Sequence, residues 1–251
     1  MADRLVVRKC AGMAEFQRCV ELQKEIWGEA DIEVEPATLF VVASETGGQV
    51  LGAFDGEKLV GYTVALVGYT NGRVFLHSHM TGVLAEYRDR GAGRALKLFQ
   101  REEALGRGIR LVVWTFDPLE TRNAHFNLNR LGAISRKYLP NLYGVTSSPL
   151  HWGLPTDRLW VEWHLDSKRV VGAVQDLASG DWRMGSDEAA ARIELPRELE
   201  EWKKTDAEGV AKVQEHIRGE FMKWFAKGYA AVGVKQTDAG VAYVLAPWSD
   251  F

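Results

Sequence analysis

Three consecutive apolar segments, separated by two short turns, constrain the fold of this chain more than any other feature. Asp55-Gly56 separates the runs 50–54 and 58–67, and Asn71-Gly72 precedes the run 73–84. Dipeptides of this kind form tight hairpin turns when apolar runs flank them. The sequence therefore predicts a meander of three adjacent antiparallel strands.

Helical and strand patterns surround this meander. Apolar residues at spacings of three and four predict helices, and short apolar runs predict strands. Asp117 and Pro118 fit the N-cap and the first position of a helix. The other predicted elements are, in order, a strand at 5–8, a helix at 13–27, a weakly patterned segment at 37–45, a helix at 90–106, a strand at 109–116, a helix at 118–131, and strands at 133–138 and 158–165.

A glycine-rich junction joins the third meander strand to the next helix. Gly91 and Gly93 remove Cβ atoms where the backbone has to approach a ligand closely, and the helix N-terminus presents free N–H groups. Arg88, Arg90 and Arg94 add positive charge at the same place. Together these features predict a pyrophosphate site.

Two common phosphate-binding loops fit this junction poorly. Gly91-Ala92-Gly93 begins a dinucleotide-binding pattern, and Asp117 lies 24 residues after Gly93, but Leu96 occupies the third glycine position. An antiparallel meander also replaces the parallel strand that such a fold needs. The glycines are not followed by the Lys-Ser or Lys-Thr of a P-loop.

The junction resembles the signature of the GNAT superfamily of N-acetyltransferases. Arg88-x-x-Gly91-x-Gly93 matches the R/Q-x-x-G-x-G/A motif, and Val83-x-Ala85-Glu86-Tyr87-Arg88 is similar to its V-x-P-E-Y-R approach. Leu131-Gly132-Ala133 resembles the family's L-G-F at the end of a later helix. The resemblance covers about residues 4–166 and implies a mixed α/β fold whose twisted, mostly antiparallel sheet is flanked by helices.

The resemblance implies a site for acetyl-CoA or another acyl-CoA as co-substrate. The loop would bind the diphosphate, the preceding strand would pair with the pantetheine arm, and the N–H of Gly82 or Val83 would face the thioester oxygen. The residues implied are Gly82, Val83, Leu84 and Ala85 on the strand, Arg88, Asp89, Arg90, Gly91, Ala92, Gly93 and Arg94 in the loop, and Asn123 on the later helix.

Histidines on the third meander strand are the candidate bases. His77, His79 and Thr81 share one face by the period of two, and His79 lies where family members often carry a proton-relaying carboxylate. A histidine is suited to accept the amine proton. His79 is the first candidate and His77 the second, and a structural histidine pair is the alternative.

The general acid is where the sequence departs from the family pattern. Leu128 occupies the position at which the family usually has a tyrosine that protonates the leaving thiolate. Tyr143, Tyr138 or water could replace it.

The segment from residue 140 to 157 is a long loop for a compact domain, and such loops are often functional. We expect it to cover the acceptor site. Trp152, Asp157 and Arg158 are the candidate acceptor-binding residues, with Asp157 for an ammonium and Arg158 for a carboxylate. A salt bridge between the two neighbours is the alternative.

Residues 168–251 exceed what the family domain requires. A strand at 191–196, a helix at 208–227 and a hairpin at 229–245 are predicted there. Because so small a unit is marginal alone, we expect it to pack on the domain formed by residues 1–167 or on a second subunit of a homodimer.

Composition and charge narrow the function classes. The chain has 31 Lys and Arg against 34 Asp and Glu, which argues against nucleic acid as the partner. It has no long apolar span, and its cysteines, Cys10 and Cys19, lack metal-site or disulfide spacing, so we expect a cytoplasmic protein without metal or membrane partner. The resemblance implies an N-acyltransferase acting on a small-molecule amine. A non-catalytic acyl-CoA sensor is the alternative, and an NAD-type oxidoreductase is a weaker one.

Overall fold

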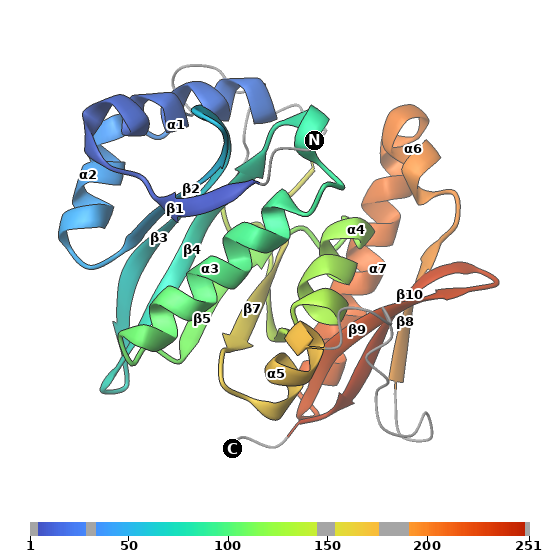
Figure 1. Ribbon diagram of the computed structural model, residues 1–251. Coiled ribbons are helices and arrows are strands. Elements are labelled where there is room, and N and C mark those ends of the chain that lie inside the picture. Colours follow the sequence, from blue (N-terminus) through green and yellow to red (C-terminus); the bar gives the residue numbers. More distant parts are fainter. Residues whose placement is uncertain (1–4, 29–33, 145–153, 176–190, 249–251) are drawn as a thin grey trace. The chain divides into compact units, whose positions relative to one another are not determined.

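A computed structural model describes residues 5–28, 34–144, 154–175 and 191–248 (Figure 1). The chain divides into two compact units, Met1–Val113 and Trp114–Phe251. The domain boundary expected near residue 167 stays a prediction.

The first unit contains the predicted meander. β1 to β4 pair antiparallel in chain order, and β5 lies parallel to β4, with Leu76 opposite Val112. Its elements are β1 (Val6–Lys9), α1 (Gly12–Trp27), α2 (Ala37–Glu45), β2 (Gln49–Asp55), β3 (Lys58–Thr70), β4 (Arg73–Val83), the 3₁₀ turn η2 (Ala85–Tyr87), α3 (Ala92–Gly106) and the start of β5 (Leu111–Phe116).

Helices cover both faces of this sheet. Tyr62 of β3 packs edge-on against Trp27 of α1 and Phe40 of α2. The next residue, Thr63, points to the opposite face, where its hydroxyl lies 3.4 Å from that of Ser78, a residue bonded to α3. The sequence order and the mostly antiparallel sheet agree with the predicted fold class, and an antiparallel meander is not a dinucleotide fold.

The second unit holds a second set of paired strands. β6 pairs antiparallel with β7 and also with β9, and β10 lies between β9 and β8. Its elements are α4 (Thr121–Ala124), the π-helical η3 (His125–Arg130), β6 (Ile134–Leu139), β7 (Arg158–His164), α5 (Lys168–Gln175), β8 (Ala191–Pro196), α6 (Leu199–Thr205), α7 (Ala207–Phe225), β9 (Tyr229–Thr237) and β10 (Gly240–Pro247).

The segment after β5 differs from the prediction. The Asp117 carboxylate accepts a hydrogen bond from the N–H of Leu119, so it closes a short turn instead of capping a helix. The helix begins at Thr121 and widens into a π-helical stretch, in which the N–H of Leu131 donates to the carbonyl of Phe126.

The C-terminal residues are built into this second unit. Ser135 of β6 lies opposite Ala231 of β9, and the Asn129 side chain bonds both the N–H and the carbonyl of Val234. Phe221 of α7 stacks on Tyr138 of β6, with ring centroids 5.6 Å apart. Residues 191–247 therefore extend the sheet at β6 instead of folding alone.

Two helices of this region were not predicted. α5 contains Gly172 and two adjacent valines, which weaken a helical pattern, and α6 is only seven residues long. Met222 of α7 is exposed.

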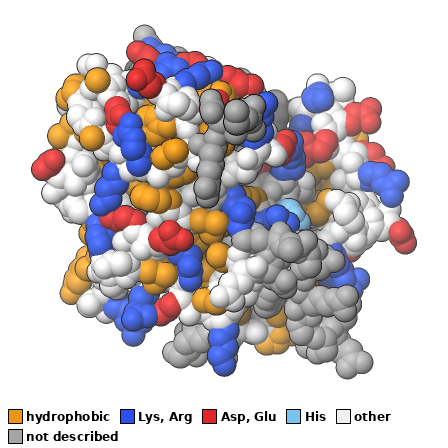
Figure 2. All heavy atoms as spheres, viewed as in Figure 1, with side chains coloured by type: hydrophobic (Ala, Val, Ile, Leu, Met, Phe, Trp, Pro, Cys, Tyr) orange, Lys and Arg blue, Asp and Glu red, His pale blue; other side chains and the backbone are white. Residues whose placement is uncertain are grey.

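Charged side chains of both signs occur together on one face of the molecule (Figure 2). Figure 2 shows Lys and Arg side chains interspersed with Asp and Glu over the face that it presents. In the described parts of the chain no helix is long and apolar enough to span a membrane.

Candidate functional site

The junction between β4 and α3 is a tight loop that opens a helix N-terminus. Asp89 and Gly91 both have left-handed backbone angles, with φ of 60° and 82°, and the first helical bond runs from Ala95 N–H to the carbonyl of Gly91. The N–H groups at the start of a helix have no partner within the helix. The loop therefore offers adjacent backbone donors at the positive end of α3.

Glycine suits positions 91 and 93 of this loop for different physical reasons. Gly91 adopts a φ that side chains disfavour. Gly93 has ordinary helical geometry, and a Cβ there would lie 3.8 Å from its nearest neighbour, Val83. Internal packing does not require a glycine at position 93. A missing side chain over open space is what close approach of a ligand needs.

Arginines surround this loop. Arg88 and Arg90 are exposed, and Arg94 is half-buried. The Arg88 side chain donates to the Val83 carbonyl over 3.3 Å, and the Arg90 guanidinium lies 5.4 Å from the centre of the Tyr87 ring. Both residues lie in the loop that precedes the N-terminus of α3.

The end of β4 presents one edge of its backbone away from β3. The Leu84 N–H donates to the carbonyl of Val60, and Gly61 lies opposite Val83. Because backbone groups alternate between the two edges of a strand, the N–H and carbonyl of Val83 point away from β3. Of the two backbone donors considered for the thioester oxygen, this geometry favours Val83 over Gly82.

A β-bulge at His79 rearranges the faces of β4. Ser78 lies opposite Ala65 and Met80 opposite Val64, so His79 is the extra residue. The predicted grouping of His77, His79 and Thr81 on one face is therefore wrong for Thr81. Its hydroxyl bonds Thr63 over 2.7 Å, on the face covered by α3.

The two histidines remain neighbours but differ in surroundings. Their ring centroids lie 6.0 Å apart. His79 Nε2 lies 3.1 Å from a carboxylate oxygen of Glu35, and both side chains are partly exposed. Burial, together with the nearby His79 and Lys97, lowers the pKa of His77 to about 4. His77 is therefore neutral at physiological pH.

A buried lysine lies under this strand. Lys97 of α3 donates to the Ser78 hydroxyl over 2.8 Å and to the Gln100 side chain over 3.0 Å. Burial lowers its pKa to about 7. The available sequence signal is that Lys97 precedes Gln100 by three positions and so lies on the same face of α3.

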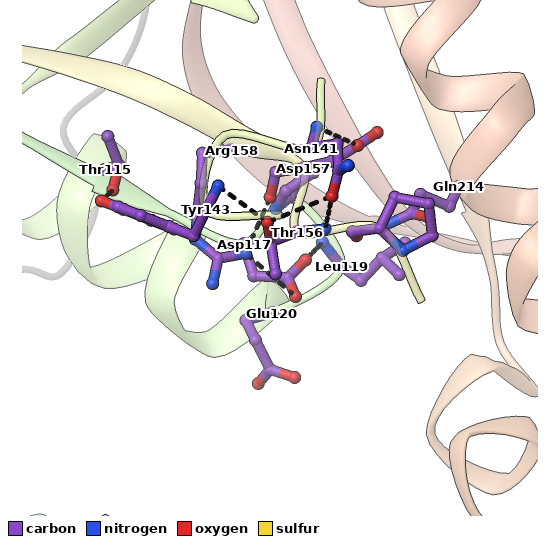
Figure 3. Close-up of polar contacts among 12 residues, drawn as sticks. Thr115, Asp117, Leu119, Glu120, Asn141, Tyr143, Thr156, Asp157, Arg158 and Gln214 are labelled. Carbon is purple, nitrogen blue, oxygen red and sulfur yellow. Dashed lines mark hydrogen bonds and ion pairs between the residues drawn. The ribbon is translucent and has the colours of Figure 1, made fainter. Parts of the chain in front are cut away.

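Three candidate residues of the second unit, Tyr143, Asp157 and Arg158, lie in one polar cluster (Figure 3). The Tyr143 hydroxyl lies 2.9 Å from that of Thr115, and the Tyr143 side chain is exposed. The Arg158 guanidinium lies 5.4 Å from the centre of the Tyr143 ring and 3.8 Å from the Asp117 carboxylate. Arg158 is nearly buried among these neighbours.

The contacts of Asp157 are those of a buried residue that stabilises the fold. Its carboxylate is fully buried and accepts hydrogen bonds from Tyr138, from the Asn141 N–H and from two nitrogens of Arg218 in α7. This set of partners does not favour the predicted contact with an acceptor ammonium. Asn123 lies in α4 and is exposed. Trp152 lies outside the described residues.

Sequence comparison identifies the fold family of the first part of the chain. The model of the acetyltransferase (GNAT) family matches residues 16–133. Residues 16–133 thus match a GNAT domain. This confirms the resemblance drawn from the glycine-rich junction. No curated protein matches the sequence significantly.

Solved structures share the GNAT fold at low sequence identity. The YncA protein of Salmonella typhimurium, solved with its cofactor acetyl-CoA, is 17% identical with a TM-score of 0.53, over 65% of this chain and 95% of its own. The ribosomal-protein-S18-alanine N-acetyltransferase of Escherichia coli is 13% identical with a TM-score of 0.50, over 65% and 96%. Aminoglycoside 6'-acetyltransferase type Ii is 16% identical with a TM-score of 0.50, over 65% and 99%.

The coenzyme used by GNAT enzymes fits the residues present. The start of α3 supplies N–H donors, Gly93 leaves open space beside them, and exposed arginines supply positive charge. Among the described residues, no group of three or more His, Cys, Asp or Glu side chains could hold a metal ion.

The position of the usual GNAT acid has no hydroxyl. Leu128 is fully buried in the π-helical stretch, and its carbonyl accepts a hydrogen bond from Arg169. Burial, together with the bond to Asp157, raises the pKa of Tyr138 well above its ordinary value. Of the two tyrosines considered as replacements, Tyr143 is the exposed one.

Proposed function

We propose that this protein is an acyl-CoA-dependent N-acyltransferase that transfers an acetyl group, or a larger acyl group such as succinyl, to the amine of a small molecule or amino acid. The observation that carries this proposal is the β4–α3 junction, where helix N–H donors, two exposed arginines and the open space at Gly93 coincide. A diphosphate matches this combination of directed donors and positive charge.

The reaction is a direct transfer. The neutral acceptor amine attacks the thioester carbonyl carbon, the new N–C bond forms, and the C–S bond breaks to release the coenzyme thiolate. The Val83 N–H stabilises the oxygen that gains negative charge. His79 takes the proton that the nitrogen loses, either directly or through water. Tyr143 is the proposed proton source for the thiolate.

A glycine substitution with a matched control tests the coenzyme site. Gly93→Val places a side chain beside the N–H donors, and Gly219→Val makes the same change in α7, where a Cβ would meet no atom within 4 Å. Valine has a higher helix propensity than glycine, so neither variant should lose helix stability, and the gain should be under about 1 kcal/mol in both. We expect Gly93→Val to weaken coenzyme A binding at least tenfold in calorimetry, and Gly219→Val to leave it unchanged. Equal affinities in the two variants would refute the proposed site.

The acceptor is tested by thiol release across a panel of amines. Because the similar folds include enzymes named for aminoglycoside and for ribosomal-protein alanine, the panel contains amino acids, aminoglycosides and N-terminal peptides. Acceptor-dependent release of free coenzyme supports the transferase. Tight acetyl-CoA binding without such release would support a sensor module, the second candidate, which the buried Leu128 at the usual acid position favours.

A further inference from the structure

Glu35 approaches His79 from a different part of the chain. It lies between α1 and α2, 44 positions before His79, and its carboxylate oxygen is 3.1 Å from His79 Nε2. His79 is the extra residue of the β-bulge in β4, so no residue of β3 lies opposite it. The contact therefore depends on two irregular features of the backbone, a connection and a bulge.

A buried glutamine holds Glu35 in place. Gln23 of α1 has no exposed surface, and its amide accepts from the Glu35 N–H over 2.8 Å and donates to the Glu35 carbonyl over 2.9 Å. A buried amide with both functions satisfied fixes the backbone of its partner. The Glu35 carboxylate is thus anchored at its backbone rather than carried by a free loop.

The contact decides which nitrogen of His79 can take a proton. An ionised carboxylate only accepts hydrogen bonds, so the His79 nitrogen that faces it has to carry hydrogen. In the neutral ring this leaves the lone pair on Nδ1. When Nδ1 gains a proton, the Nε2–H bond to Glu35 is kept and the new positive charge lies beside a negative one.

We infer that Glu35 is a positioning residue that fixes His79 as the Nε2–H tautomer and thereby makes Nδ1 the atom that receives the acceptor's proton. This inference rests on the proposed function. In the step concerned, the amine nitrogen forms the N–C bond, its N–H bond breaks, and that proton goes to His79 Nδ1 while the coenzyme leaves as thiolate. Glu35 itself neither gains nor loses a proton.

The test combines a spectroscopic and a kinetic measurement on the full-length protein. Nitrogen-15 correlation spectra at pH 8 report which imidazole nitrogen carries hydrogen, and His79→Gln assigns the signal. Glu35→Gln removes the charge and lets the amide act as donor or acceptor. Glu25→Gln is the matched control, since the exposed Glu25 of α1 pairs with Arg18 of the same helix. Unfolding curves check that both variants fold.

We expect the wild-type protein and Glu25→Gln to show the Nε2–H tautomer, and Glu35→Gln to show a substantial Nδ1–H population. With an acceptor found in the panel, Glu35→Gln should lower kcat by roughly tenfold to a hundredfold, with little change in the KM for acyl-CoA. A wild-type Nδ1–H tautomer, or wild-type kcat in Glu35→Gln, would overturn the inference. Absence of any acceptor-dependent turnover would count against the proposed function instead. The tautomer measurement would still show whether Glu35 holds His79 with hydrogen on Nε2.

Discussion

Replacing Lys97 with methionine should change how the stability of this protein depends on pH. Burial lowers the pKa of Lys97 from 10.5 to about 7. The difference between these two values, at about 1.36 kcal/mol per pH unit, corresponds to about 5 kcal/mol for burying the charged form. Between pH 7 and 10.5 the unfolded chain holds a proton that the folded protein has released. The free energy of unfolding therefore rises with pH across this window, and the full cost is present below it.

The hydrogen bonds of Lys97 act in the opposite direction. Its ammonium or amine bonds Ser78 and Gln100, and methionine would leave these buried groups short of a partner. Such a loss costs about 1–3 kcal/mol. We therefore expect Lys97→Met to be more stable than wild type by about 2–4 kcal/mol at pH 6, where the buried charge is removed, and no more stable near pH 10.

Urea unfolding at intervals from pH 6 to 10 measures this effect. Lys24→Met, a change at an exposed lysine of α1, serves as control and should run parallel to wild type. The difference between Lys97→Met and wild type should change by several kcal/mol over this range, with similar m-values. A difference that stays constant with pH would show that Lys97 is not buried as a charge at low pH, and the reasoning would be refuted.

The buried His77 imidazole and the Arg218–Asp157 ion pair lead to two further predictions. Burial lowers the pKa of His77 to about 4, so its imidazole NMR signals should not titrate between pH 5.5 and 8. Its contribution to the free energy of unfolding should rise with pH from about 4 to 6.5. An NMR titration midpoint near 6.5 would contradict this. Arg218→Met leaves the buried Asp157 carboxylate without its charged partner. Because other donors to Asp157 remain, we expect the free energy of unfolding to fall by about 2–3 kcal/mol, measured by thermal unfolding. Lys212→Met removes an exposed pair as a control and should cost under about 0.5 kcal/mol. Equal losses in these two variants would mean that the Arg218 pair does not stabilise the fold.

Local patterns were enough to predict the meander of the first unit. The turn pairs Asp55-Gly56 and Asn71-Gly72 lie between strands that pair as expected, because these turn types and the apolar runs beside them determine the pairing together. The loop at Gly91 was also predictable, since its left-handed φ requires a residue type that the sequence displays. Such features depend on neighbours within a few residues.

Segments whose structure depends on distant partners were not predictable. The Asp117-Pro118 pair fits a helix start as well as a turn, and only the position of Leu119 against the carboxylate distinguishes the two. The pairing of Asp157 with Arg218 joins residues 61 positions apart, so a substrate-binding aspartate and a structural one look alike in the sequence.

The bulge at His79 shows why the sequence pointed to His79 as a candidate base but not to its neighbour Glu35. A period of two assigns faces correctly only while each residue has one partner on the next strand, and one inserted residue reverses every assignment beyond it. His77 and His79 precede or form the insertion and stay together, whereas Thr81 follows it and turns toward α3. Glu35 carried no motif of its own, and its role follows from Gln23 and the bulge bringing a connection and a strand within hydrogen-bond distance. In this chain, residue type indicates which chemistry is possible, and the irregular backbone determines which side chains come within hydrogen-bond distance of one another.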